Sequence, residues 1–222
     1  MLAAYDTAAW QATDAVLATH PKAEPSGRYI AHLTEAGWVV DFGHLNVAGN
    51  KFLVSHEATQ AAIPAHFNVK SFDPDREDVG WNLAAAKAVE IAAKDFGPTT
   101  RPYNIAVLPA SRGSLYVYLY PAQVKVGVYP LGGDARYRVS PDGAKIIEKR
   151  HMHKSIIESI SADPKVKVES GYHTHVLSDV PEDTDVFLVL TRQPKVPEIV
   201  VTQHYMYTIA TDGTITVADR PK

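Results

Sequence analysis

Short β-prone runs, most of them bounded by tight turns, recur along the chain and constrain its fold more than any other feature. Two turns have a clear mechanism, because Ser140-Pro141-Asp142-Gly143 and Thr211-Asp212-Gly213 carry Asp and Gly where a hairpin needs them. Strands joined by tight turns lie side by side, so the pattern favours an α+β fold, a mixed β-sheet packed by helices, over a doubly wound parallel sheet. The predicted strands are 37–43, 51–57, 66–72, 103–109, 114–120, 134–139, 145–148, 166–173, 198–202, 205–209 and 214–217.

Helical periodicity is confined to a few segments. The clearest runs from Trp81 to Phe96, where alanines and larger apolar residues recur at helical spacing. We expect Asp78 to cap its start and Gly97-Pro98 to end it. Two shorter helices are predicted over 7–18 and about 151–160, the second because Met152, Ile156 and Ile160 would share one side.

Composition excludes several classes of protein. With 222 residues, of which 45% are hydrophobic, the chain can bury a core. A net charge of -3, with no block of like charge, argues against nucleic acid and membrane surfaces as partners. No run reaches the roughly 20 apolar residues of a membrane span. The first 20 residues lack the features of a signal peptide, which leaves open a cytoplasmic location or export with a leader already removed. The oligomeric state stays open as well.

The chain contains no cysteine. This absence excludes disulfides, thiol nucleophiles, iron–sulfur clusters and zinc held by sulfur. A metal ion would therefore be bound by imidazole and carboxylate groups, for which ten histidines supply ligands.

The most informative segment is Gly171–Leu190, which contains His173-Thr174-His175 and, ten residues later, Asp185. On a strand, residues two apart point to the same face, so both imidazoles can approach one ion. The turn through Asp179-Val180-Pro181 can bring the Asp185 carboxylate back over them. Two nitrogens and one oxygen leave a fourth tetrahedral position for water on a zinc ion.

These residues resemble the motif of the JAB1/MPN (JAMM) metalloprotease family. The family's hallmark is His-x-His, usually followed by Pro, and then a Pro-Ser-x-x-Asp segment; here Pro181-Glu182-Asp183-Thr184-Asp185 is similar to the latter. The strands and turn at 197–213, and the order of helix and strands over 79–120, are also similar. The resemblance covers about residues 76–218.

The resemblance implies a JAB/MPN-like domain over 76–222, with the layering of cytidine deaminases, and a strand-rich N-terminal extension over 1–75. It implies one Zn²⁺ bound through His173, His175 and Asp185, and hydrolysis of peptide or isopeptide bonds in a peptide or protein substrate. It also implies a helix over 183–191, although the sequence from Val186 to Leu190 is β-prone.

Three departures from the family pattern bear on activity. Val176 replaces the usual proline, and Glu182 replaces the serine whose hydroxyl helps to stabilise the oxyanion. The family's general base is a glutamate on an early strand, and its equivalent here falls at Tyr103-Asn104. Spacing selects none of the possible substitutes, of which Glu182 and Glu148 are our candidate catalytic residues; the others are Glu57 and Glu169. The alternative hypothesis is therefore a catalytically inactive JAB-like module that binds protein.

Other interpretations stay open. His173 and His175 can be ordinary histidines on the polar face of a strand. His151 and His153 form a second His-x-His pair, but inside a helix their side chains diverge, and His153 reaches the first pair only if the chain is extended there. Tyrosines 116, 118 and 120 share one strand face, which suggests an unrelated hydrolase or a carbohydrate-binding fold, or packing beneath a helix.

Overall fold

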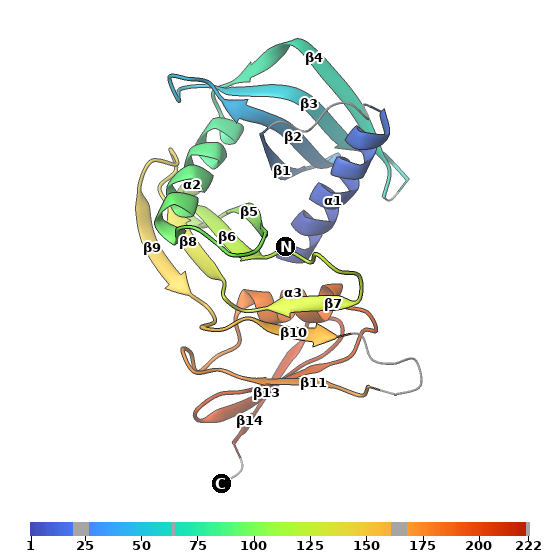
Figure 1. Ribbon diagram of the computed structural model, residues 1–222, viewed down its shortest axis with the longest axis vertical. Helices are drawn as coiled ribbons and strands as arrows, with labels where there is room; N and C mark the ends of the chain where they lie inside the picture. The colour runs from blue at the N-terminus through green and yellow to red at the C-terminus, as the bar shows by residue number, and fades with distance from the viewer. Residues whose placement is uncertain (20–26, 64, 161–167, 221–222) are drawn as a thin grey trace. The chain divides into compact units, whose positions relative to one another are not determined.

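The computed structural model describes residues 1–19, 27–63, 65–160 and 168–220 (Figure 1). Within them the protein is α+β, with three α-helices and four small sheets. The chain divides into two compact units: Met1–Gly97 with Ile105–Val117 and Tyr137–Lys149, and Pro98–Asn104 with Tyr118–Arg136 and Arg150–Lys222. None of the described helices is long and apolar enough to cross a membrane.

The elements follow in this order along the chain. They are α1 (Leu2–Thr19), β1 (Arg28–Thr34), β2 (Gly37–Leu45), β3 (Phe52–Gln60), β4 (Phe67–Asp78), α2 (Trp81–Phe96), β5 (Tyr103–Pro109), a 3₁₀ turn (Ser111–Gly113), β6 (Leu115–Pro121), β7 (Val128–Leu131), β8 (Ala135–Val139), β9 (Ile146–His151), β10 (Ile157–Ile160), β11 (Gly171–Thr174), α3 (Asp183–Thr191), β12 (Glu198–Val201), β13 (Tyr205–Ile209) and β14 (Ile215–Asp219).

The first unit contains the antiparallel sheet β1-β2-β3-β4, against which α1 packs (Figure 1). Small and apolar residues of α1, among them Tyr5, Ala12 and Val16, are fully buried. The Tyr5 hydroxyl also accepts a hydrogen bond from the Ala31 backbone in β1, at 3.3 Å. The helix predicted over 7–18 therefore exists and begins five residues earlier.

Helix α2 has the predicted bounds, and its buried face consists largely of alanine. Gly97 ends it with φ of 86°, a left-handed conformation that glycine adopts without steric cost. The predicted cap is wrong in detail, because Gly80 occupies the N-cap position without a side-chain bond. Asp78 instead accepts a hydrogen bond from the Gly80 backbone, at 2.9 Å.

The predicted helix over 151–160 is wrong. Strand β9 continues to His151, and Ile157–Ile160 forms β10, which pairs antiparallel with β7. Ile157 lies opposite Leu131 in that pair. Pairing with a distant segment outweighed a helical pattern that only three apolar residues supported. Strands β1, β7 and β10 were not predicted, and the part of the predicted strand 166–173 before residue 168 lies outside the described residues.

The second unit contains the sheet β11-β12-β13-β14, in which β11 runs parallel to β12 and the other pairs are antiparallel. Helix α3 covers this sheet through Val189, which packs with Val200 and Ile209. The helix predicted over 183–191 is thus confirmed. The domain boundary expected between residues 75 and 76 falls within β4, and the division into 1–75 and 76–222 stays a prediction.

Candidate metal centre

Three imidazoles and one carboxylate converge in the second unit. His153, His173, His175 and Asp185, here called the donor cluster, each offer one ligand atom, and these atoms lie within 4.8 Å of one another. His173 lies on β11, His175 follows that strand, and Asp185 lies in the first turn of α3. This group could hold one metal ion.

Local structure positions the carboxylate of Asp185. Its Oδ2 accepts a hydrogen bond from the backbone of Glu182, the N-cap residue of α3, at 2.6 Å. The Glu182 side chain in turn accepts from the Asp185 backbone, which completes a capping box. Glu182 Oε1 also accepts a hydrogen bond from Arg150 Nη2, at 2.5 Å. The candidate catalytic residue Glu182 therefore caps α3 and orients Asp185.

His153 is the member of the cluster that the sequence prediction set aside. It follows β9 in a stretch without helix, so its side chain is free of the divergence that a helix would impose. Its Nε2 lies 3.0 Å from that of His175 and 3.0 Å from Asp185 Oδ1. His151 is exposed. The His-x-His spacing of residues 151 and 153 could have indicated this ligand. We discounted it because the incorrectly predicted helix would have separated the two side chains.

Outer hydrogen bonds fix the tautomer of each imidazole. The Nδ1 atoms of His153, His173 and His175 lie 2.9 Å from Asp134 Oδ1, 2.7 Å from Glu198 Oε1 and 3.1 Å from the Val180 carbonyl, respectively. Because carboxylates and carbonyls only accept, each Nδ1 carries the proton and donates it. In the neutral rings each Nε2 is therefore a lone pair directed into the cluster.

The spacing of these lone pairs suits a single cation. His173 Nε2 lies 3.2 Å from His175 Nε2, and His173 and His175 lie 3.0 and 3.1 Å from oxygens of Asp185. A tetrahedron with metal–ligand distances of about 2.0–2.1 Å has edges of roughly 3.3 Å. Lone pairs and an anionic carboxylate at such distances repel one another unless positive charge lies between them.

The pKa values express the same preference for positive charge. Burial lowers the pKa of His153, but hydrogen bonds with Asp134 and Asp185 outweigh it and raise that pKa to about 10. The pKa of His173 is also raised, because bonds with Asp185 and Glu198 outweigh its burial. Burial raises the pKa of Asp185, yet its three imidazole partners hold it far below its usual value. A proton or a metal ion can supply the charge that these shifts favour.

Each outer carboxylate is itself anchored. Asp134 accepts from the Thr184 hydroxyl at 2.5 Å, in addition to its bonds from His153. Glu198 Oε2 accepts a hydrogen bond from Arg192 Nη1, at 2.6 Å. Glycine at position 171 makes room for this pair, since a Cβ there would lie 1.9 Å from Glu198 Oε2 and 2.5 Å from Arg192 Nη1. The sequence prediction did not include Asp134 or Glu198.

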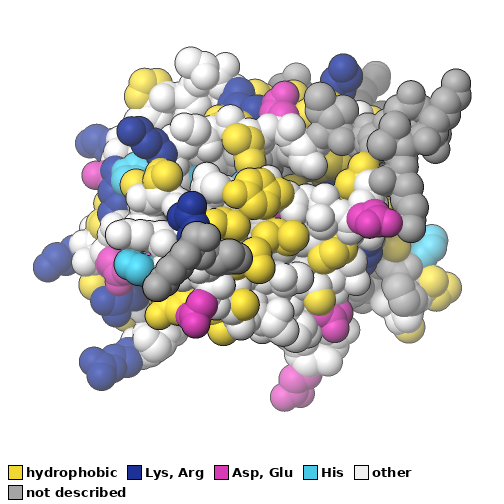
Figure 2. Space-filling view, turned by 90° about the horizontal axis from the view of Figure 1, so that it is seen from below, with side chains coloured by type: hydrophobic (Ala, Val, Ile, Leu, Met, Phe, Trp, Pro, Cys, Tyr) yellow, Lys and Arg dark blue, Asp and Glu magenta, His cyan; other side chains and the backbone are white. Residues whose placement is uncertain are grey.

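A groove of about 710 Å³ reaches the cluster, and His153, His173 and His175 line it. Its remaining lining is mostly apolar and includes Tyr172 and Val176, whose exposed fractions are 63% and 75%. Hydrophobic side chains also gather across the middle of the face in Figure 2. The donor cluster is thus accessible from a surface that suits apolar side chains.

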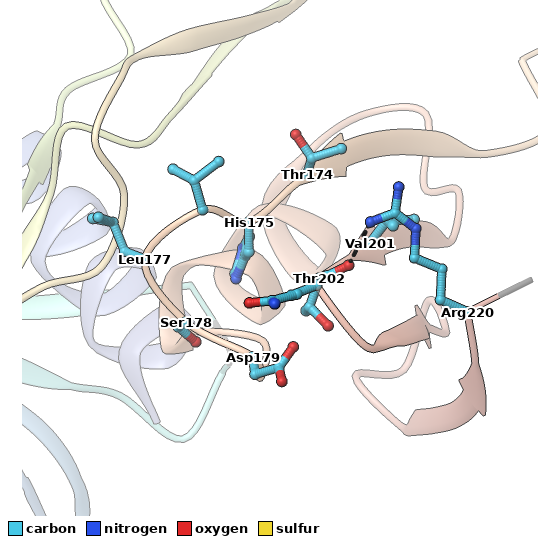
Figure 3. Close-up of a pocket in the computed structure, with 10 residues that line it drawn as sticks. Thr174, His175, Leu177, Ser178, Asp179, Val201, Thr202 and Arg220 are labelled. Carbon is cyan, nitrogen blue, oxygen red and sulfur yellow. Dashed lines mark hydrogen bonds between the residues drawn. The ribbon is translucent and has the colours of Figure 1, made fainter. Parts of the chain in front are cut away.

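A second hollow also borders the loop that carries His175. Thr174 to Asp179 form one side of it, with Thr202 and Arg220 on the other (Figure 3). Arg220 donates to the Thr202 carbonyl at 3.2 Å. This hollow, of about 580 Å³, is more polar than the groove, and His175 borders both.

The other candidate residues are engaged with other partners. Glu148 belongs to the first unit, where it faces Arg138 at 3.4 Å, and Glu57 of that unit binds Arg76 at 3.0 Å. Of the three strand tyrosines, Tyr118 and Tyr120 are buried, and Tyr118 donates to Asp183 at 3.0 Å. This burial favours packing over a binding platform.

Comparison with known proteins gives no further guide to this site. The chain matches no protein-family model, no curated protein and no solved structure.

Proposed function

We propose that the protein is a zinc-dependent hydrolase of peptide or isopeptide bonds, with one Zn²⁺ bound by the donor cluster. The observation that carries the proposal is the convergence of three imidazole lone pairs and a buried carboxylate beside a groove. Borderline nitrogen and hard oxygen donors that lie within 4.8 Å of one another suit Zn²⁺. When bound, such an ion acts as a Lewis acid and supplies a hydrolytic nucleophile near neutral pH.

The residues of the chain would contribute orientation and binding. Asp134 and Glu198 hold two rings with their Nε2 atoms inward, so little reorganisation accompanies binding of the ion. The apolar walls of the groove would bind side chains of a peptide or protein substrate and exclude water from the reacting bond. The resemblance of residues 171–185 to JAMM enzymes supports the choice of an amide bond as the target.

The test combines metal analysis with hydrolysis. Protein purified without chelator is expected to contain one equivalent of zinc and to cleave members of a library of peptides and isopeptide-linked peptides. His173→Ala should lose both the zinc and the cleavage, whereas His204→Ala, which changes an exposed histidine, should keep both. A protein that binds no zinc, or that cleaves equally well after His173→Ala, would contradict the proposal.

The second candidate function is a catalytically inactive module that binds protein. It is favoured by the number of protein donors, since four ligands complete a tetrahedral site as in structural zinc centres. Glu182, at the position of the family's serine, is also occupied by Arg150 and the helix cap. This alternative predicts stoichiometric zinc without turnover of any library member, and turnover that Asp185→Ala abolishes would reject it.

A further inference from the structure

We propose that His153 is a displaceable fourth ligand, which keeps the metal centre closed until a group from the groove takes its place. The inference rests on the proposed metal binding and concerns the regulation of that site. A hydrolase needs one free position on its metal ion, and the four donors of this cluster would leave none. Displacement of His153 would provide that position.

The four donors fall into two classes by their place in the chain. His173, His175 and Asp185 lie within thirteen residues, on β11, the loop after it and the start of α3. Such a set of three leaves one tetrahedral position for the reaction. His153 comes from a separate stretch between β9 and β10, and its Nε2 fills that fourth position, 3.0 Å from both His175 and Asp185.

His153 is also the donor with the least confined side chain. Its side chain is 9% exposed, against 5% for His173, 1% for His175 and 0% for Asp185. Met152, His153, Lys154 and Ser155 all line the groove, so a molecule within it would contact this stretch directly.

Rotation of the His153 ring would leave no buried charge without a partner. Asp134 would lose the bond from Nδ1 but would keep the His153 backbone N–H at 3.0 Å and the Thr184 hydroxyl at 2.5 Å. The same backbone bond, with that of Met152 to the Asp134 carbonyl at 3.1 Å, holds the main chain in place. The movement therefore needs only a change of side-chain rotamer, whose cost is small compared with that of an unpaired buried carboxylate.

The experiment uses the full chain loaded with Co²⁺, whose visible spectrum reports coordination number, and azide as a small competing ligand. We expect the wild type to give a four-coordinate spectrum that resists azide. His153→Ala and His153→Gln should still bind one Co²⁺ and should bind azide at least about tenfold more tightly, since a closed population above 90% weakens apparent affinity by that factor. His151→Ala is the matched control, because this exposed histidine shares the same His-x-His pair, and it should behave as the wild type.

Each outcome decides the inference. Equal azide affinity in the wild type and both variants would overturn it, as would loss of stoichiometric metal in both variants, because His153 would then be an indispensable ligand. With a cleavable substrate in hand, the His153 variants should exceed wild-type turnover, because their centre lacks the closed form, and turnover no higher than that of the wild type would also overturn it. If no form cleaves any substrate, the hydrolase proposal fails, while the azide titration still decides the role of His153.

Discussion

Asp41 in the first unit and Asp185 in the second are both buried among polar groups, and their two environments differ in kind. In the first unit Asp41 receives Arg76 Nη2 at 2.8 Å and Asn82 Nδ2 at 2.7 Å, so each of its oxygens faces a donor of the protein. In the second unit the Asp185 carboxylate faces imidazole nitrogens whose own protons are committed outward. Both oxygens of Asp41 are thus satisfied by donors of the protein, whereas the donor cluster requires additional positive charge.

The pKa shifts of the two aspartates follow this difference. Both are buried, at 1% and 0% exposed. Burial raises the pKa of Asp41, and the bond from Asn82 and the charge of Arg76 only partly offset it. For Asp185 three imidazoles outweigh the same penalty, and its pKa falls. The two carboxylates thus differ in the number of titratable groups that converge on them, and hardly in their burial.

Metal removal is expected to have the largest effect, and to act on the second unit and not on the first. A chelator should destabilise the second unit by about 4 kcal/mol when the free metal had been near 1,000 times its Kd. Hydrogen exchange should increase in β11 and α3 and stay unchanged in α1 and β2. If hydrogen exchange is the same with and without chelator in both units, the donor cluster needs an ion no more than the Asp41 network does.

The next largest effect is expected when the ion pair of Asp41 in the first unit is broken. Arg76→Met leaves Asp41 without its cationic partner, and removal of one member of a buried pair costs about 3–5 kcal/mol. Because the Arg76 side chain is 35% exposed, solvent screening reduces our expectation to about 2 kcal/mol. Urea unfolding measures the loss, and metal content should not change.

Lys51→Met is the control for this substitution, since it breaks the exposed pair with Glu77. It should cost less than about 1 kcal/mol. If Arg76→Met proves as mild, or if it removes the metal, the contrast drawn between the units is wrong.

The smallest effect concerns the outer layer of the donor cluster. In Glu198→Gln the neutral amide orients His173 less firmly, and metal affinity should fall about 10–100-fold. Competition with a chromophoric chelator measures this affinity. Glu158→Gln, which alters an exposed pair with Arg101 in the same unit, should leave it unchanged. Unchanged affinity in Glu198→Gln would mean that the fixed tautomer contributes nothing to binding.

The sequence predicts those features that depend on neighbours in the chain. The periodicity of α2, the β-strand spacing of His173 and His175, and the return of Asp185 after a turn are all local, and the structure brings the last three side chains together. Residues supplied by tertiary pairing were missed. Strand β10 exists because it pairs with β7, more than twenty residues earlier, and this pairing removes the helix that had seemed to direct His153 elsewhere.

The outer carboxylates had no sequence signal at all. Asp134 precedes a strand and Glu198 begins one, in contexts typical of solvated residues. Only the fold shows that both are buried against imidazoles. Second-layer partners of this kind are single residues without a fixed spacing to the ligands, so a linear motif cannot contain them.

Gly171 has a consequence for tracing this centre through evolution. The residue touches no ligand atom, yet a methyl group at its α-carbon would occupy the place of the Glu198 carboxylate. In a descendant chain with a larger residue there, the ends of the Glu198 and Arg192 side chains would have to shift, even with every ligand intact. A bare α-carbon at this position is therefore worth following in such chains together with the histidines.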